Sequence, residues 1–86
     1  DAEYNAGVFR AILAGEGEAP KSPLRAIHDA VVMNAAAGLV AYRPTNGESF
    51  EARFTQALAD ARESIASGAA ERVLNAWVEF SSKRAE

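Results

Sequence analysis

The sequence predicts an all-α protein of about four helices. Two observations lead to this fold class. Apolar residues recur at three- and four-residue spacing in successive segments, which is the period of one helix face. Short stretches rich in Gly, Pro, Ser and Asn separate these segments and favour turns, and no segment reads as a β-strand.

The first predicted helix runs from about Glu3 to Ala14 and has one apolar face. That face consists of Val8, Phe9, Ile12 and Leu13. Gly15 is expected to form the C-terminal cap, because glycine accepts the left-handed backbone conformation at little cost. The stretch from Gly15 to Pro23 contains two glycines and two prolines, and it is therefore predicted to be a loop.

The second predicted helix runs from about Pro23 to Tyr42. Ser22 followed by Pro23 is a start signal, because a capping hydroxyl precedes a proline at the first helical position. The side chains expected to point inward in its first half are Leu24, Ile27 and Val31, and those expected to point outward are Arg25 and Asp29.

The second predicted helix is apolar on nearly every side from Ala30 to Val40. Such a helix is normally buried. Four helices of this length have difficulty covering it completely. The run Ala35-Ala36-Ala37-Gly38 would also let neighbouring backbones approach closely. Arg43 to Glu48, with a proline and an Asn-Gly pair, is predicted to be the next turn.

The third predicted helix runs from about Ser49 to Ala66, and the fourth from about Ala69 to Ser82. Ser67-Gly68 is expected to break the third helix and cap the fourth. Glu79 lies four residues before Lys83, which is the favourable orientation for an ion pair on a helix. The residues expected to point inward are Phe50, Phe54, Leu58, Ala61 and Ile65 in the third helix, and Val73, Leu74, Trp77 and Val78 in the fourth.

The composition indicates a small core. Hydrophobic residues make up 49% of the 86 positions, but 20 of them are alanine and only 18 are Leu, Ile, Val or Phe. Large apolar side chains supply most of the stabilisation of a core, and short chains have an unfavourable ratio of surface to volume. We therefore expect either very close packing through alanine or burial against something outside this sequence.

Several classes of protein are excluded by composition. There is no cysteine, so disulfides and thiolate metal sites are absent. The net charge is -3 and the nine basic residues are scattered, which argues against a nucleic-acid or anionic-membrane partner. The longest apolar run is too short to span a bilayer, and no signal peptide opens the chain. We expect a cytoplasmic location.

Candidate catalytic groups are few. Gly15-Glu16-Gly17 is the only glycine-rich loop, but its glutamates would repel phosphate and no helix begins directly after it. We interpret it as a helix cap and a turn. His28 is the only histidine, and Asp29 should point about 100° away around the helix. We therefore expect a surface or boundary histidine. The carboxylate pairs with helical spacing are interpreted as a solvated face; they are Glu48 with Glu51 and Asp60 with Glu63.

Two asparagines are the polar residues of most interest. Asn34 lies in the most apolar stretch, and an unpaired buried amide would cost about 1–3 kcal/mol, so we expect it to make a structural hydrogen bond. Asn5 is expected to cap its helix or to make a packing hydrogen bond. Trp77 and Phe80 are expected at the core and its boundary. The residues alone predict no catalytic, substrate-binding or metal-binding site.

Two segments, taken together, resemble a known enzyme family. The segment Asp1 to Gly15 carries Asn5-Ala6, then Arg10-Ala11, and ends in Leu13-Ala14-Gly15; a loop follows, and then His28 to Leu39 with Asn34-Ala35-Ala36 at its centre. This order resembles the carboxy-terminal portion of anthranilate phosphoribosyltransferase. The ending is also similar, with Ser67-Gly68-Ala69-Ala70 before a last helix containing Trp77-Val78. The resemblance covers essentially all 86 residues.

The resemblance implies an activity for a longer parent protein. That family transfers phosphoribosyl from phosphoribosyl pyrophosphate to the amino group of anthranilate in tryptophan biosynthesis, with magnesium, usually as a homodimer. Residues 1–86 would then be a single helical segment from the carboxy-terminal part of the larger α/β domain, which the nucleoside phosphorylases share. A chain beginning at Asp1 without an initiator Met agrees with a segment of a longer protein. Its partner would be the rest of the parent α/β domain.

The family's glycine-rich diphosphate loop, magnesium-binding acidic pair and anthranilate contacts lie upstream and match no position here. We therefore expect these 86 residues to bind no magnesium and to be inactive alone. Asn5 and Asn34 match family positions and are interpreted as structural. Two alternatives stay open. One is a small helical module that self-associates through its alanine-rich helix, and the other is a carboxy-terminal piece of an enzyme resembling pyrimidine nucleoside phosphorylase.

Overall fold

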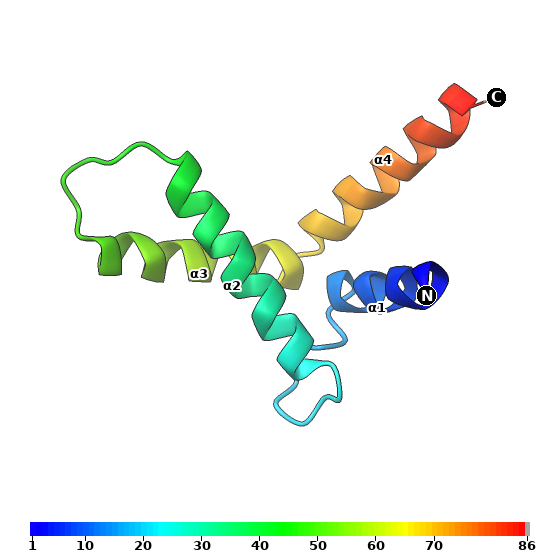
Figure 1. Ribbon diagram of the computed structural model, residues 1–86, viewed down its shortest axis with the longest axis horizontal. Helices are drawn as coiled ribbons and strands as arrows, with labels where there is room; N and C mark the ends of the chain where they lie inside the picture. Colours follow the sequence, from blue (N-terminus) through cyan, green and yellow to red (C-terminus); the bar gives the residue numbers. More distant parts are fainter. Residues whose placement is uncertain (86) are drawn as a thin grey trace.

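A computed structural model describes residues 1–85 of the chain. They form four α-helices, namely α1 (Ala2–Leu13), α2 (Arg25–Tyr42), α3 (Phe50–Ala66) and α4 (Ala69–Ala85) (Figure 1). No β-strand occurs within these residues. The predicted all-α class and the number of helices are confirmed.

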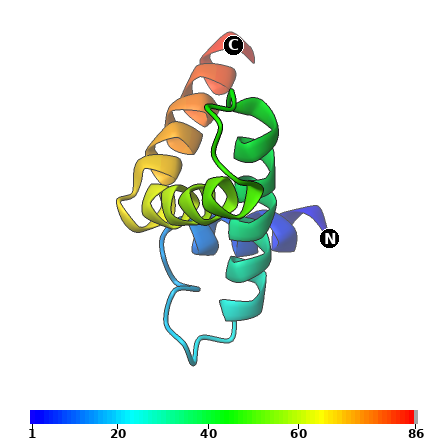
Figure 2. The ribbon, with the colours of Figure 1, turned by 90° about the vertical axis from the view of Figure 1, so that its left-hand side faces the viewer.

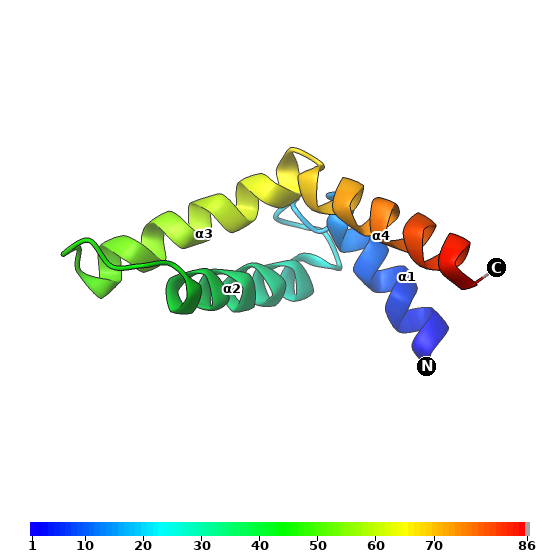
Figure 3. The same cartoon turned by 90° about the horizontal axis from the view of Figure 1, so that it is seen from above.

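Two of the helices form a pair, and the other two project from it. α2 and α3 lie side by side, whereas α1 and α4 extend from one end of this pair and carry both termini there (Figures 1 and 3). Figure 2 shows the α1–α2 loop below the helices. The radius of gyration is 14.9 Å, whereas a compact domain of this length has about 12 Å. The arrangement is therefore extended.

Local sequence explains the ends of α1 and α3. The Asp1 carboxylate accepts a hydrogen bond from the backbone N–H of Tyr4 at 2.7 Å and begins α1. Gly15 has a φ of 90°, and its N–H donates to Ile12 while the N–H of Glu16 donates to Ala11. This Schellman motif confirms the predicted glycine cap. Ser49 caps α3 in the same way as Asp1 caps α1, at 3.1 Å from the Ala52 N–H.

The start of α2 differs from the prediction. Ser22 and Pro23 lie in a turn, and the helix begins two residues after Pro23, at Arg25. The Ser22 hydroxyl accepts from the Leu24 N–H at 3.1 Å and donates to the Glu16 carbonyl at 2.8 Å. Its hydrogen bonds therefore tie the loop to itself, and in the described part of the chain no side chain caps the N-terminus of α2.

The core is small and rich in alanine. Its large buried side chains are Ile12, Leu13, Val32 and Ile65. The other buried apolar residues on α2 and α3 are alanines, namely Ala36, Ala57 and Ala61. Small side chains let two helix backbones approach closely, as expected from the composition.

Several side chains predicted to point inward are exposed. Ile27 is 44% exposed, and Trp77 and Phe80 on α4 are 63% and 55% exposed, so their placement in or beside the core was wrong. Other apolar residues predicted inward but found exposed are Phe9, Phe50, Val73 and Val78. Phe9, Val73 and Trp77 line an open hollow between α1 and α4, so the sparse packing of these two helices leaves their apolar faces exposed. Leu74 is half-buried and packs against the core.

Candidate functional site

His28 is buried, contrary to the prediction of a surface or boundary residue. Its side chain is only 4% exposed, and its Nδ1 lies 3.2 Å from Asp29 Oδ1. The prediction that Asp29 points away was wrong as well, because the two side chains bend toward each other in the first turns of α2. The hydrogen bond from His28, followed by that from Arg25, holds the pKa of Asp29 below its ordinary value. His28 Nε2 has no hydrogen-bond partner among residues 1–85.

Gly17 packs directly against His28. A Cβ built on Gly17 would lie 2.8 Å from His28 Cβ, 2.9 Å from Ile12 Cδ1 and 3.0 Å from the Leu24 carbonyl oxygen. Gly17 is therefore a packing residue, buried where the loop meets α1 and α2. The loop makes a helix cap and a close contact, and its backbone does not surround an open anion site.

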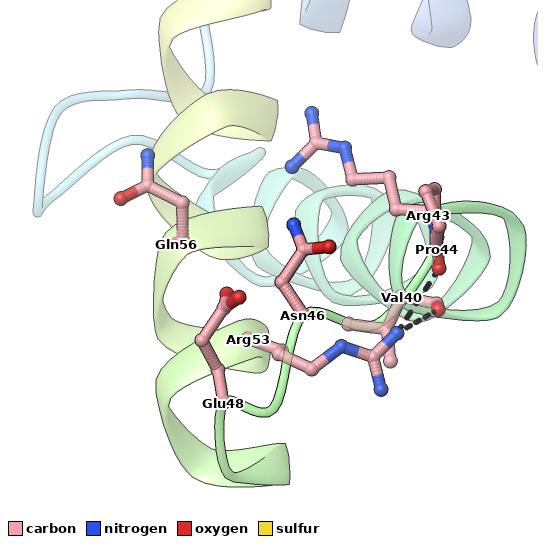
Figure 4. A pocket seen from close by; sticks show the side chains of 7 residues that line it. All are labelled: Val40, Arg43, Pro44, Asn46, Glu48, Arg53 and Gln56. Atoms are coloured by element: carbon pink, nitrogen blue, oxygen red, sulfur yellow. Dashed lines mark hydrogen bonds between the residues drawn. The ribbon is translucent and has the colours of Figure 1, made fainter.

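A polar cluster links the end of α2 to α3. Arg43 Nη1 donates to Asp60 Oδ2 at 2.7 Å, and this hydrogen bond, followed by one from Gln56, lowers the pKa of Asp60. Arg53 Nη2 donates to the carbonyl oxygens of Val40 at 2.7 Å and Arg43 at 3.3 Å (Figure 4). These carbonyls end α2 and lack intrahelical partners, so Arg53 caps the helix.

An open pocket of about 260 Å³ adjoins this polar cluster. It is lined by Val40, Arg43, Pro44, Asn46, Glu48, Arg53 and Gln56 (Figure 4). Both arginines already serve structural contacts there. Within residues 1–85 there is no group of three or more His, Cys, Asp or Glu side chains that could hold a metal ion. The geometry here supports helix capping rather than catalysis.

Both predicted structural asparagines are exposed. At the start of α1, Asp1 provides the capping side chain, and the backbone N–H of Asn5 donates to the Asp1 carbonyl at 2.9 Å. Asn34 lies on the side of α2 that faces away from α3. Within the described residues its amide is not buried, so a structural hydrogen bond at Asn34 stays a prediction that requires a covering surface.

An open, mainly apolar groove lies between the helices. One hollow of about 390 Å³ lies between α1, α2 and α3, and a second of about 470 Å³ extends along α4. The two hollows share Phe9, Leu13, Ser64 and Ala70. The first also contains Ala35 and Leu39, and the second contains Val73 and Trp77. We refer to both together as the interhelical groove.

A second uncovered surface lies on α2 itself. We define the α2 outer face as the exposed residues on the side away from α3: Ala26, Ile27, Ala30, Asn34, Ala37, Gly38 and Ala41. None of them is charged. The groove and this face are therefore surfaces suited to contact with another segment of protein.

Comparison with known proteins identifies several relatives of similar sequence. The sequence is 46% identical over 87 residues to an anthranilate phosphoribosyltransferase of Mycobacterium sp. (strain KMS). It is 43% identical over 82 residues to that of Rhodococcus jostii (strain RHA1), and 47% identical over 79 residues to that of Salinispora arenicola (strain CNS-205). These alignments cover 96%, 95% and 92% of this chain, respectively.

The chain spans only about a fifth of these relatives, covering 22%, 21% and 20% of their lengths. No protein-family model matches the sequence. No solved structure matches it either. The resemblance predicted from the sequence is confirmed, and the chain is homologous to a segment of anthranilate phosphoribosyltransferases. Among residues 1–85, no helix is long and apolar enough to cross a membrane.

Proposed function

We propose that this chain is a helical segment from the carboxy-terminal portion of an anthranilate phosphoribosyltransferase. The complete enzyme would transfer phosphoribosyl from phosphoribosyl pyrophosphate to the amino group of anthranilate in the cytoplasm. The observation that carries the proposal is 40–47% identity to such enzymes over nearly the whole chain. Similarity confined to one motif would carry much less weight, because motifs recur in unrelated proteins.

The catalytic groups of the complete enzyme would lie in the remaining four fifths of its sequence. Two features of the described residues support this division. They do not fit a magnesium site, since they contain no cluster of His, Cys, Asp or Glu that could hold a metal ion. The best-defined polar groups are also engaged in structure, with Arg53 on backbone carbonyls and Arg43 on Asp60. The 86 residues alone would be inactive.

The segment would form one helical layer of a larger α/β domain, in a homodimeric enzyme. The exposed apolar residues on α1, α2 and α4 support this role, because a complete small domain buries most side chains of this kind. The same exposure would also suit a self-associating helical module, which is the second candidate function.

Loss of anthranilate fluorescence in the presence of phosphoribosyl pyrophosphate and magnesium tests the activity. The protein that carries this chain should consume anthranilate, and the 86-residue chain alone should not. Turnover by the short chain would refute our assignment of the catalytic groups. Absence of turnover by the longer protein, together with phosphate-dependent cleavage of a pyrimidine nucleoside, would favour the nucleoside phosphorylase alternative. A protein of only this length that forms dimers would favour the self-associating module.

A further inference from the structure

The asparagines of the chain differ in the backbone that follows them. The sequence contains four asparagines, and all four are exposed. Three of them lie in helices and precede alanine: Asn5 in α1, Asn34 in α2 and Asn75 in α4. The fourth, Asn46, precedes Gly47 in the loop between α2 and α3. Contact with water is therefore common to all four side chains, and local backbone structure separates Asn46 from the others.

Few contacts hold the backbone of the loop between α2 and α3. All residues from 41 to 50 are exposed. The hydrogen bond from the Arg43 N–H to the Leu39 carbonyl closes α2. Beyond it, the N–H groups of residues 45–48 donate to no backbone carbonyl within residues 1–85. Exposed segments with few internal contacts open at little cost in free energy, so this loop can change conformation while the helices stay folded.

Gly47 leaves the backbone nitrogen after Asn46 accessible. Gly47 has a φ of 88°, and a Cβ added there would meet no atom within 4 Å. Since glycine has no side chain, the Asn46 side chain can approach the Gly47 nitrogen without steric hindrance. After each helical asparagine, by contrast, the alanine N–H belongs to the hydrogen-bonded helical backbone. Such a nitrogen can meet the preceding side chain only when the helix opens.

The charge around Asn46 favours an anionic product. Asn46 lines the same pocket as Arg43 and Arg53, and no hydrogen bond joins its amide to the other residues drawn in Figure 4. Its side chain is therefore not held in place by these neighbours. Negative charge that develops on the Asn46 carbonyl group would form in a pocket that carries two guanidinium groups. Positive charge nearby stabilises both an anionic intermediate and a carboxylate product.

We propose that Asn46–Gly47 is a site of spontaneous deamidation in the folded protein. Asparagine is a chemically labile residue. The Gly47 nitrogen gives up its proton and bonds to Asn46 Cγ, while the Cγ–Nδ2 bond breaks and ammonia leaves with that proton. Water then adds to either carbonyl of the resulting succinimide and cleaves one of its C–N bonds. The products are aspartate and isoaspartate, in which the main chain runs through the former side chain. Overall, one water is consumed and one ammonia is released.

The modification changes the polar cluster that links α2 to α3. It adds one negative charge to the pocket, and the new carboxylate competes with Asp60 for Arg43 and with the Val40 carbonyl for Arg53. Isoaspartate also lengthens the main chain of the loop by one methylene group. The reaction needs only the loop and water, so it does not depend on the proposed function.

Peptide mass spectrometry of the folded protein that carries this chain tests the proposal during incubation at mildly alkaline pH. The peptide containing Asn46 should gain the mass difference between an amide and an acid. An isoaspartate-specific methyltransferase should label the same peptide. Conversion of Asn5, Asn34 and Asn75 should be at least about tenfold slower, because each helix must open first. No conversion at Asn46, or equal rates at all four asparagines, would overturn the proposal.

Asn46→Gln is the matched variant. Its side chain keeps the amide at an exposed position and should leave the Tm unchanged, while the additional methylene group disfavours ring closure. The mass gain and the methyltransferase label should both disappear from this peptide. Labelling that persists in Asn46→Gln would contradict the assignment of the site.

Incubation in guanidinium chloride separates the effect of the fold from that of the Asn-Gly pair. Because the loop opens at little cost, Asn46 should react in the folded protein at a rate close to that in the unfolded chain. A folded protein in which Asn46 reacts at least about tenfold more slowly than in the unfolded chain would have a protected loop, and this result would overturn the proposal.

Discussion

Gly17→Ala tests the packing of the α1–α2 loop against the core. Gly17 does not have a positive φ, so its backbone conformation would accept alanine. The space would not, because the new Cβ would lie 2.8 Å from His28 Cβ and 2.9 Å from Ile12 Cδ1. His28 Cβ is fixed to the α2 backbone, and the Leu24 carbonyl at 3.0 Å is itself backbone. Two of these three neighbours can move only with the main chain.

The expected magnitude follows from two opposing terms. Forcing a methyl group into a packed site costs about 1–3 kcal/mol. Replacing glycine by alanine also restricts the unfolded chain, which returns about 0.4–1 kcal/mol. The net loss should be about 1–2 kcal/mol, which corresponds to roughly a 5- to 30-fold change in the equilibrium between closed and open forms.

Amide hydrogen exchange measured on peptides from the protein that carries this chain is the direct assay. Exchange across residues 14–24 should accelerate by about 5- to 30-fold in Gly17→Ala. Ile12→Val removes Cδ1 and so one of the three close contacts. In that background Gly17→Ala should cost less, which a double-mutant cycle measures. Unchanged exchange in Gly17→Ala, or full additivity of the two substitutions, would refute the packing argument.

Three further predictions concern α2 and its contacts with α3. Arg53→Met removes the hydrogen bonds to the Val40 and Arg43 carbonyls and should cost about 1–3 kcal/mol in chemical unfolding; an unchanged midpoint would exclude the capping role. The pKa of Asp60 is lowered in the folded state, so ionised Asp60 contributes to the stability of the fold. This contribution is complete at a pH above the ordinary aspartate pKa of about 3.9 and is lost as the pH falls through the lowered pKa. Asp60→Asn should therefore reduce the fall in Tm between about pH 5 and pH 2, and an identical fall would contradict this reasoning. Asn34→Leu should clearly lower the Tm of the complete enzyme but should weaken its affinity for substrate only slightly. An unchanged Tm with a large loss of affinity would instead indicate that Asn34 contacts the substrate.

The sequence predicted the helices and one helix end well because these depend on neighbouring residues. Three- and four-residue periodicity identified all four helices, and the left-handed preference of glycine identified the end of α1 at Gly15. The prediction based on Ser22-Pro23 began α2 two residues too early. A serine followed by proline also suits a turn, and in this chain the Ser22 hydroxyl bonds within the loop.

Contacts between residues far apart in the sequence could not be predicted from the spacing of neighbouring residues. Arg53 reaches Val40 across 13 positions, and Arg43 reaches Asp60 across 17, so no local spacing signals either contact. The buried His28 packs against Gly17, a loop glycine whose packing role has no sequence signature. The predictions that Trp77 and Ile27 point inward assumed that each apolar face finds a partner in the same 86 residues.

The mass of the intact protein that carries this chain tests the central claim most directly. An antibody against these 86 residues would recover it from the source cells for mass spectrometry. A segment of an anthranilate phosphoribosyltransferase should be recovered within a polypeptide several times heavier than the 9.1 kDa of this chain. Recovery of a product of 9.1 kDa alone, translated from its own start codon, would contradict the account.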